Sequence, residues 1–143
     1  MPQSDNYNEV SILLVEDDDI DAQGMKRAFK KMRILNPMTR VQNGFEALEA
    51  LKSDSVPKPR IVLLDLHMPK MNGLEFLEHI RNDDSLEDTV VFVLTTSKSE
   101  EDMTAAYKQN IAGYIVKTEL DTSFQQLVNL LTSYWRVIEL PKN

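Results

Sequence analysis

Short apolar runs of three to five residues recur along the chain, and a polar residue suited to metal or phosphate chemistry follows each of them. The clearest runs cover residues 12–15, 61–64, 90–94 and 114–116. Apolar runs of this length, bounded by turn residues, predict strands that are buried on both faces of a parallel sheet. The residues that follow the runs are Glu16 with Asp17, Asp65, Thr95 with Thr96, and Lys117. Because ligands of parallel sheets bind beyond the carboxyl ends of the strands, these side chains should gather at one edge.

The segments between the runs carry apolar residues at helical spacing. Such residues at positions 22, 25, 28, 29 and 32 predict a first helix, which Asp18 or Asp19 could cap. We also expect a weaker strand at residues 38–41 and further helices at 45–52, around 74–80, at 100–110, and from about 122 to beyond Trp135. Asn43-Gly44 is predicted to form a turn. Five strand–helix units in succession predict an α/β fold, in which helices cover both faces of a doubly wound, five-stranded parallel sheet.

Length and composition are those of one compact domain, with 143 residues of which 42% are hydrophobic. A net charge of −7, with no basic cluster longer than Lys30-Lys31, argues against direct binding of nucleic acid. The absence of cysteine excludes disulfides and thiolate chemistry. No segment resembles a signal peptide or is long and apolar enough to span a bilayer, so we expect a cytoplasmic protein without a membrane contact.

Three carboxylates are expected to share the carboxyl edge of the sheet. Glu16, Asp17 and Asp65 would repel one another unless a cation joined them, and ligand sets made only of oxygen favour Mg²⁺. With Mg²⁺ bound, a carboxylate can act as nucleophile toward a phosphoryl group, because the metal and a lysine neutralise the phosphoryl oxygens. Lys117 would supply that charge, and the hydroxyl of Thr95 could donate a hydrogen bond to a phosphoryl oxygen.

Four motifs, in this order and spacing, resemble those of the receiver domain of two-component response regulators. They are the acidic pair in Leu14-Val15-Glu16-Asp17-Asp18, the phospho-acceptor motif Leu64-Asp65-Leu66-His67-Met68-Pro69 with Asn72-Gly73, the switch hydroxyl in Leu94-Thr95-Thr96-Ser97, and the aromatic and lysine in Gly113-Tyr114-Ile115-Val116-Lys117. The resemblance implies a flavodoxin-like sheet with strand order 2-1-3-4-5. It also implies a receiver domain at residues 10–132, between an N-terminal tail at 1–9 and a C-terminal extension of the last helix at 133–143.

The resemblance implies the site chemistry as well. Asp65 would take a phosphoryl group from a sensor histidine kinase in a Mg²⁺-dependent reaction. Asp17 would be a direct Mg²⁺ ligand, Glu16 would act mostly through water, and His67 would contribute its backbone carbonyl. The side chain of His67 is expected to face solvent and is given no chemistry of its own.

The family's switch residues match this chain at Thr95, Tyr114 and Lys117. The resemblance implies that Thr95 moves toward the phosphoryl group and that the ring of Tyr114 turns inward to fill the vacated space. Asp65, Thr95 and Lys117 would form the catalytic set. The protein would then be a signalling switch that catalyses only its own phosphorylation and dephosphorylation.

The chain departs from the commonest family pattern at its last helix. Thr118 stands where proline usually follows the motif lysine, and a tryptophan-containing ending prolongs the helix. Both features are similar to single-domain regulators that partner bacterial phytochrome kinases. The helix carries a second apolar stripe at Leu130, Tyr134 and Val137, which we interpret as a possible homodimer interface.

Two other functions are compatible with the same residues. A phosphate sink or phosphorelay intermediate would use the acceptor without an output surface of its own. A Mg²⁺-dependent aspartyl-phosphate phosphatase is less favoured, because such enzymes place a second aspartate two residues after the nucleophile, where this chain has His67. No DNA-binding segment follows the receiver motifs, so direct transcriptional output is not expected.

Overall fold

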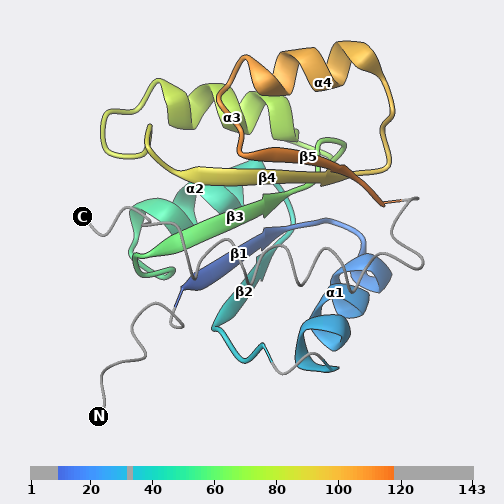
Figure 1. Ribbon diagram of the computed structural model, residues 1–143. Helices are drawn as coiled ribbons and strands as arrows, with labels where there is room; N and C mark the ends of the chain where they lie inside the picture. The colour runs from blue at the N-terminus through green and yellow to red at the C-terminus, as the bar shows by residue number, and fades with distance from the viewer. Residues whose placement is uncertain (1–9, 32–33, 118–143) are drawn as a thin grey trace.

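The computed structural model describes residues 10–31 and 34–117, which form a parallel sheet with helices against both faces (Figure 1). The sheet consists of β1 (Ser11–Val15), β2 (Met38–Val41), β3 (Arg60–Leu64), β4 (Val90–Thr95) and β5 (Gly113–Val116). The strands lie in the order β2-β1-β3-β4-β5 and all neighbours pair in parallel. The predicted doubly wound fold and its strand order are therefore confirmed.

Successive residues of the central strands point to opposite faces, which gives two separate cores. Leu13, Val15, Val62 and Leu64 belong to the core beneath α2 (Gly44–Lys52), α3 (Gly73–Arg81) and α4 (Glu100–Tyr107). Ile12, Leu14, Ile61 and Leu63 belong to the core beneath α1 (Asp19–Lys31), on the other face. β1 and β3 are buried throughout and β4 is buried from Val91 onward, as predicted. The edge strands β2 and β5 are half-buried, so the prediction that residues 114–116 are buried on both faces is wrong.

The prediction of a turn at Asn43-Gly44 is wrong, because both asparagine–glycine pairs begin helices. The side chain of Asn43 accepts a hydrogen bond from the backbone N–H of Glu46 at 3.0 Å, and α2 starts at Gly44. Asn72 caps α3 in the same way, and Glu75 completes a capping box with it. At the start of α1, the carboxylate of Asp18 accepts from the N–H of Asp21 at 3.0 Å, as predicted for a cap.

Helix α4 ends at Tyr107, three residues before the end predicted from the sequence. Residues 108–110 form a turn that ends with Asn110 at a φ of 59°, a left-handed conformation that asparagine tolerates. The guanidinium of Arg81 donates hydrogen bonds to the carbonyls of Gln109 and Asn110. These bonds satisfy two carbonyl groups that have no partner within the helix.

Several predictions fall on residues that the structure does not describe. They are the tail at residues 1–9, the end of the first helix at residue 32, the last helix with its extension at 133–143, the peptide at Thr118, and the apolar stripe of Leu130, Tyr134 and Val137. Within the described ranges, no helix is long and apolar enough to cross a membrane.

The close approach of α3 to the end of β3 requires a glycine at position 73. A β-carbon there would lie 2.5 Å from the carbonyl oxygen of Asp65 and 2.7 Å from the α-carbon of Leu66. The N–H of Gly73 donates to the carbonyl of Leu66 at 2.9 Å, which ties the helix to this loop. The glycine therefore fixes the loop that carries Asp65.

We predict that Gly73→Ala lowers the free energy of unfolding by about 1–3 kcal/mol, because the added methyl group must displace backbone atoms. Gly24→Ala is the matched control, since Gly24 lies inside α1 and its β-carbon would have no neighbour closer than 4.0 Å. That variant should gain about 0.5–1 kcal/mol from the lower entropy of the unfolded chain. Urea unfolding measures both, and equal effects would contradict the close approach.

Candidate functional site

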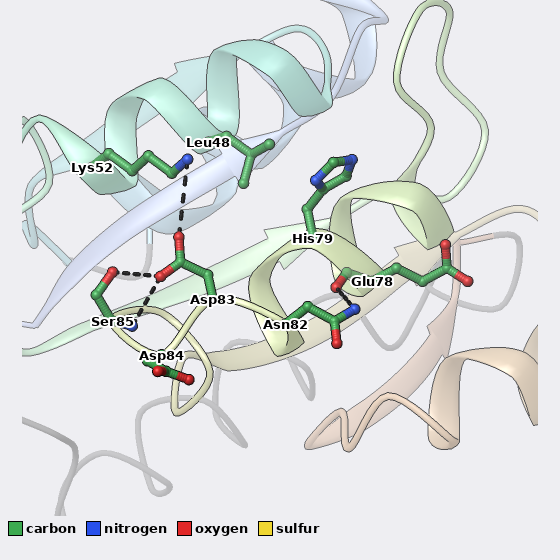
Figure 2. Close-up of a pocket in the computed structure, with 8 residues that line it drawn as sticks. All are labelled: Leu48, Lys52, Glu78, His79, Asn82, Asp83, Asp84 and Ser85. Atoms are coloured by element: carbon green, nitrogen blue, oxygen red, sulfur yellow. Dashed lines mark hydrogen bonds and ion pairs between the residues drawn. The ribbon is translucent and has the colours of Figure 1, made fainter.

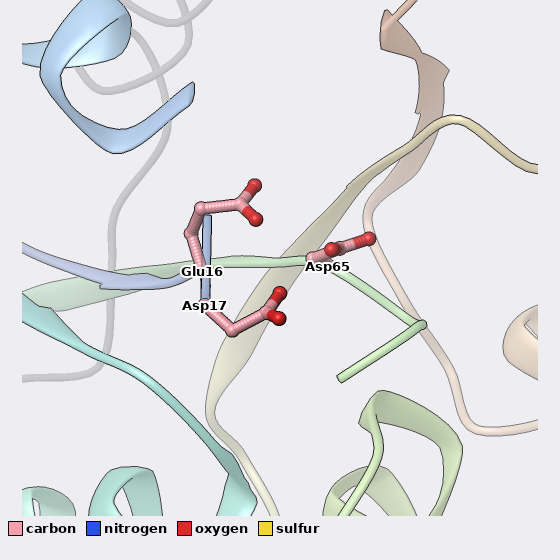
Figure 3. Close-up of side chains that lie close together, drawn as sticks. All are labelled: Glu16, Asp17 and Asp65. Carbon is pink, nitrogen blue, oxygen red and sulfur yellow. The ribbon is translucent and has the colours of Figure 1, made fainter. Parts of the chain in front are cut away.

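Three carboxylates meet at the carboxyl edge of the sheet, as the sequence pattern predicted. Glu16 and Asp17 follow β1, and Asp65 follows the neighbouring strand β3. One oxygen from each residue lies within 4.8 Å of the other two, and Figure 3 shows the three side chains around one space. Glu16 and Asp65 are buried, whereas Asp17 is exposed. A set of carboxylate oxygens at this spacing fits a hard divalent cation such as Mg²⁺.

The loop that carries the acidic pair is held by Arg40, on the adjacent strand β2. Its Nε donates to the carbonyl oxygen of Glu16 at 2.7 Å, and its Nη1 contacts Asp19 Oδ1 at 2.8 Å. The side chain of Arg40 is only 16% exposed, whereas that of Asp19 is 72% exposed, so the bond to the carbonyl of Glu16 is the better shielded of the two. The guanidinium thus fixes both the end of β1 and the start of α1.

Lys117, directly after β5, reaches across the edge to the acidic residues. Its ammonium group donates hydrogen bonds to Glu16 Oε1 and to Asp21 Oδ2, the latter at 2.9 Å. The distance from Lys117 Nζ to Asp65 Oδ2 is 3.9 Å. The structure therefore brings the predicted positive charge beside the predicted acceptor, with Asp21 as an additional partner that no motif indicated.

Burial and charge shift the pKa values of Glu16 and Lys117 in opposite directions. Burial raises the pKa of Glu16 to about 7, although the hydrogen bond from Lys117 opposes the shift. Burial alone would lower the pKa of Lys117, but its bonds to Glu16 and Asp21 outweigh this effect and raise it. Lys117 therefore stays cationic, and a bound cation would favour the ionised form of Glu16.

Thr95 ends β4 and is fully buried. Because β3 and β4 pair in parallel, with Leu64 opposite Val93, Thr95 lies at the same edge of the sheet as Asp65. Its hydroxyl oxygen accepts a hydrogen bond from the backbone N–H of Ser97 at 3.4 Å. The predicted sensor hydroxyl thus contacts the loop that leads to α4.

Tyr114, on β5, contacts that same loop. Its hydroxyl donates to the carbonyl oxygen of Ser97 at 3.0 Å, and its half-buried ring packs against the core beneath α4. Burial raises the pKa of the Tyr114 hydroxyl, and the bond to Ser97 opposes the shift. The two predicted switch residues, Thr95 and Tyr114, therefore share Ser97 as a partner.

His67 connects the loop after β3 to α4. Its backbone N–H donates to Asp65 Oδ1 at 3.4 Å, and its ring Nε2 lies 3.1 Å from Asp102 Oδ2. Ser97 Oγ donates to the same oxygen of Asp102 at 2.7 Å. The side chain of His67 is 61% exposed, in agreement with the expectation that it faces solvent. The contact with Asp102 was not predicted, since no motif includes an acidic residue at that position.

A hollow of about 780 Å³ lies elsewhere, between α2 and the end of α3 (Figure 2). Its walls are mostly polar and include Lys52 and Asp83, whose side-chain N and O atoms are 3.9 Å apart. No residue that lines it comes from the acidic cluster at the strand ends. The hollow is therefore separate from the candidate site.

Comparison with known proteins identifies the family. Residues 12–130 match the sequence model described as the response regulator receiver domain. The chain belongs to this family. The response regulator Rcp1 of Synechocystis sp. is 31% identical over 135 residues, which cover 91% of this chain and 92% of that protein. A probable methanogenesis regulatory protein of Methanothrix harundinacea, FilR2, is 34% identical, with coverage of 87% and 82%.

Solved structures extend this likeness. The Mn²⁺-bound form of Rcp1 superposes with a TM-score of 0.80 at 31% identity, covering 92% of this chain and 99% of that one. The phosphorylated cyanobacterial phytochrome response regulator RcpA gives a TM-score of 0.80 at 30% identity, covering 93% and 99%. The bacteriophytochrome response regulator RtBRR gives 0.73 at 31% identity, covering 92% and 80%. The predicted family and the likeness to phytochrome-associated regulators are confirmed, and this receiver is a signalling module of a two-component system.

We predict that Arg40→Met lowers the free energy of unfolding by about 1.5–3 kcal/mol, since hydrogen bonds made by a charged group are lost. Methionine keeps the apolar stem but leaves the carbonyl of Glu16 without its donor. Arg27→Met, on the exposed side of α1, should change stability by less than about 0.5 kcal/mol. Urea unfolding of both variants checks this, and equal stabilities would show that Arg40 does not hold the loop.

Proposed function

We propose that Asp65 accepts a phosphoryl group from a sensor histidine kinase in a Mg²⁺-dependent reaction. The arrangement of three groups around Asp65 is the observation that carries the proposal. Its carboxylate shares a cluster with Glu16 and Asp17 whose oxygens lie within 4.8 Å, and Lys117 Nζ is 3.9 Å away. Lys117 and a Mg²⁺ ion held by the carboxylate cluster would neutralise a phosphoryl group on Asp65 from two directions.

Each residue of the site has a separate role in this proposal. A carboxylate oxygen of Asp65 attacks the phosphorus of a phosphohistidine, and the N–P bond breaks as the new O–P bond forms. Asp17, Asp65 and the backbone carbonyl of His67 would hold the Mg²⁺ ion, with Glu16 acting mostly through water, and the ion would supply charge stabilisation to the phosphoryl oxygens. Lys117 donates to a phosphoryl oxygen and stays protonated throughout.

The switch follows from the contacts of Thr95 in the same proposal. When the Thr95 hydroxyl turns to donate to a phosphoryl oxygen, it gives up its contact with the N–H of Ser97. Ser97 also accepts from Tyr114 and donates to Asp102 on α4, so its displacement changes contacts on α4 and β5. The phosphoryl group thereby shifts the equilibrium between two conformations of this surface, and a partner binds one of them.

The partner kinase is proposed to be of phytochrome type, because phytochrome regulators are among the structures most like this chain. Residues 10–132 would form the receiver unit and the remainder its tails.

We also propose a homodimer through Leu130, Tyr134 and Val137. We further propose a cytoplasmic location and, in view of the net charge of −7, no direct contact with nucleic acid. A phosphate sink or relay intermediate stays an alternative, whereas the contacts of Ser97 favour an output surface.

We predict that a small phosphodonor with Mg²⁺ adds one phosphoryl group to the wild-type protein, measured by intact mass. Asp65→Asn should abolish the addition, because an amide oxygen is not a nucleophile toward phosphorus under these conditions. Chelation of Mg²⁺ should have the same effect. Asp84→Asn, which removes an exposed carboxylate beside the hollow of Figure 2, is the matched control and should be labelled normally. Labelling of Asp65→Asn at the wild-type level would refute the assignment of the acceptor.

We predict that Thr95→Val accepts the phosphoryl group but does not transmit the change to α4. Valine keeps the buried volume and removes the hydroxyl that would bind the phosphoryl oxygen. In wild type, phosphorylation should alter hydrogen exchange of residues 97–107, and in this variant the exchange should stay unchanged. Thr96→Val, at the adjacent exposed position, should respond as wild type does. An equal response of Thr95→Val would exclude the proposed role of its hydroxyl.

A further inference from the structure

The ammonium group of Lys117 has more acceptors around it than the proposed reaction uses. A lysine has three N–H donors. Two are directed to Glu16 Oε1 and Asp21 Oδ2, while Asp65 Oδ2, at 3.9 Å, lies beyond hydrogen-bond distance. The lysine is therefore held on the α1 side of the site in the unphosphorylated protein.

Asp21 does not take part in the proposed metal site. It belongs to the first turn of α1, and its oxygens are not among those of the cluster formed by Glu16, Asp17 and Asp65. Its N–H is bound by the capping carboxylate of Asp18, so the start of the helix fixes its position. With 43% of its side chain exposed, Asp21 remains within reach of Lys117 without being desolvated.

A phosphoryl group on Asp65 would compete with Asp21 for the same ammonium group. A phosphoryl oxygen would take the third N–H of Lys117 and draw Nζ from α1 toward Asp65, which loosens its 2.9 Å contact with Asp21. A contact made only in the unphosphorylated state stabilises that state and lowers the affinity of the site for a phosphoryl group. The negative charge of Asp21 also disfavours a further anion beside the same lysine.

We propose that Asp21 is a positioning residue that holds Lys117 in the unphosphorylated state and so sets the threshold for activation. The inference rests on the proposed function of Asp65 and Lys117. Asp21 weakens phosphoryl binding through the lysine and does not contact the phosphoryl group itself. Its removal therefore strengthens binding, whereas structural damage to the site would weaken it.

The test is the affinity for beryllofluoride, a phosphoryl mimic, measured by calorimetry at saturating Mg²⁺. Asp21→Asn should bind it about threefold more tightly than wild type, the scale expected for an exposed ion pair. Asp21→Glu keeps the charge and should restore affinity close to that of wild type. Asp18→Asn is the matched control, because it removes one charge from the same loop, keeps a good helix cap, and should leave the affinity unchanged.

The outcomes separate this inference from the proposal on which it rests. Equal or weaker binding by Asp21→Asn would refute the role of Asp21, and so would the same gain in Asp18→Asn. In either case, the assignment of Asp65 as the acceptor would still stand if wild type bound beryllofluoride and Asp65→Asn did not. A wild-type protein that binds no beryllofluoride would instead overturn the proposed function, and the role of Asp21 with it.

Discussion

Repulsion among three carboxylates at one sheet edge is the constraint on which the rest of the site depends. The parallel pairing of β1 with β3 places Glu16 and Asp65 side by side, and both are buried. Buried anions persist only where partners compensate for lost hydration. Lys117 supplies a full charge to this cluster, and Arg40 fixes the backbone that carries it. The same arrangement leaves the site short of positive charge, which is why it suits a divalent cation.

The sequence predicted the sheet because apolar runs are a strong signal of buried strands. Each run coincided with a strand to within one residue, and the alternation of core residues followed from the pleat. Helix ends were harder to predict. Asn43-Gly44 has the composition of a turn, and only the contact with the N–H of Glu46 makes it a helix start. The turn after α4 is bound by Arg81, which is remote in sequence and donates to the carbonyls of Gln109 and Asn110.

The site was predictable for residues that directly follow strands. It was not predictable for residues in helices, because their contacts depend on the direction of the side chain. Glu16, Asp65 and Lys117 meet because parallel strands end at one edge, a rule that sequence order alone can apply. Asp21 and Asp102 lie in helices, and the sequence does not reveal which of their neighbours they face. Both were identified only from the structure, Asp21 as a partner of Lys117 and Asp102 as a partner of His67.

Ser97 explains how a change at the strand ends can reach a helix. Its N–H, hydroxyl and carbonyl contact Thr95, Asp102 and Tyr114 respectively. Asp102 also accepts from His67, so the loops after β3 and β4 share one carboxylate on α4. Polar contacts of this kind are either made or broken, and a loop held by three of them moves as a unit. If phosphorylation rotates the Thr95 hydroxyl as proposed, these contacts would carry the change to the surface formed by α4 and β5.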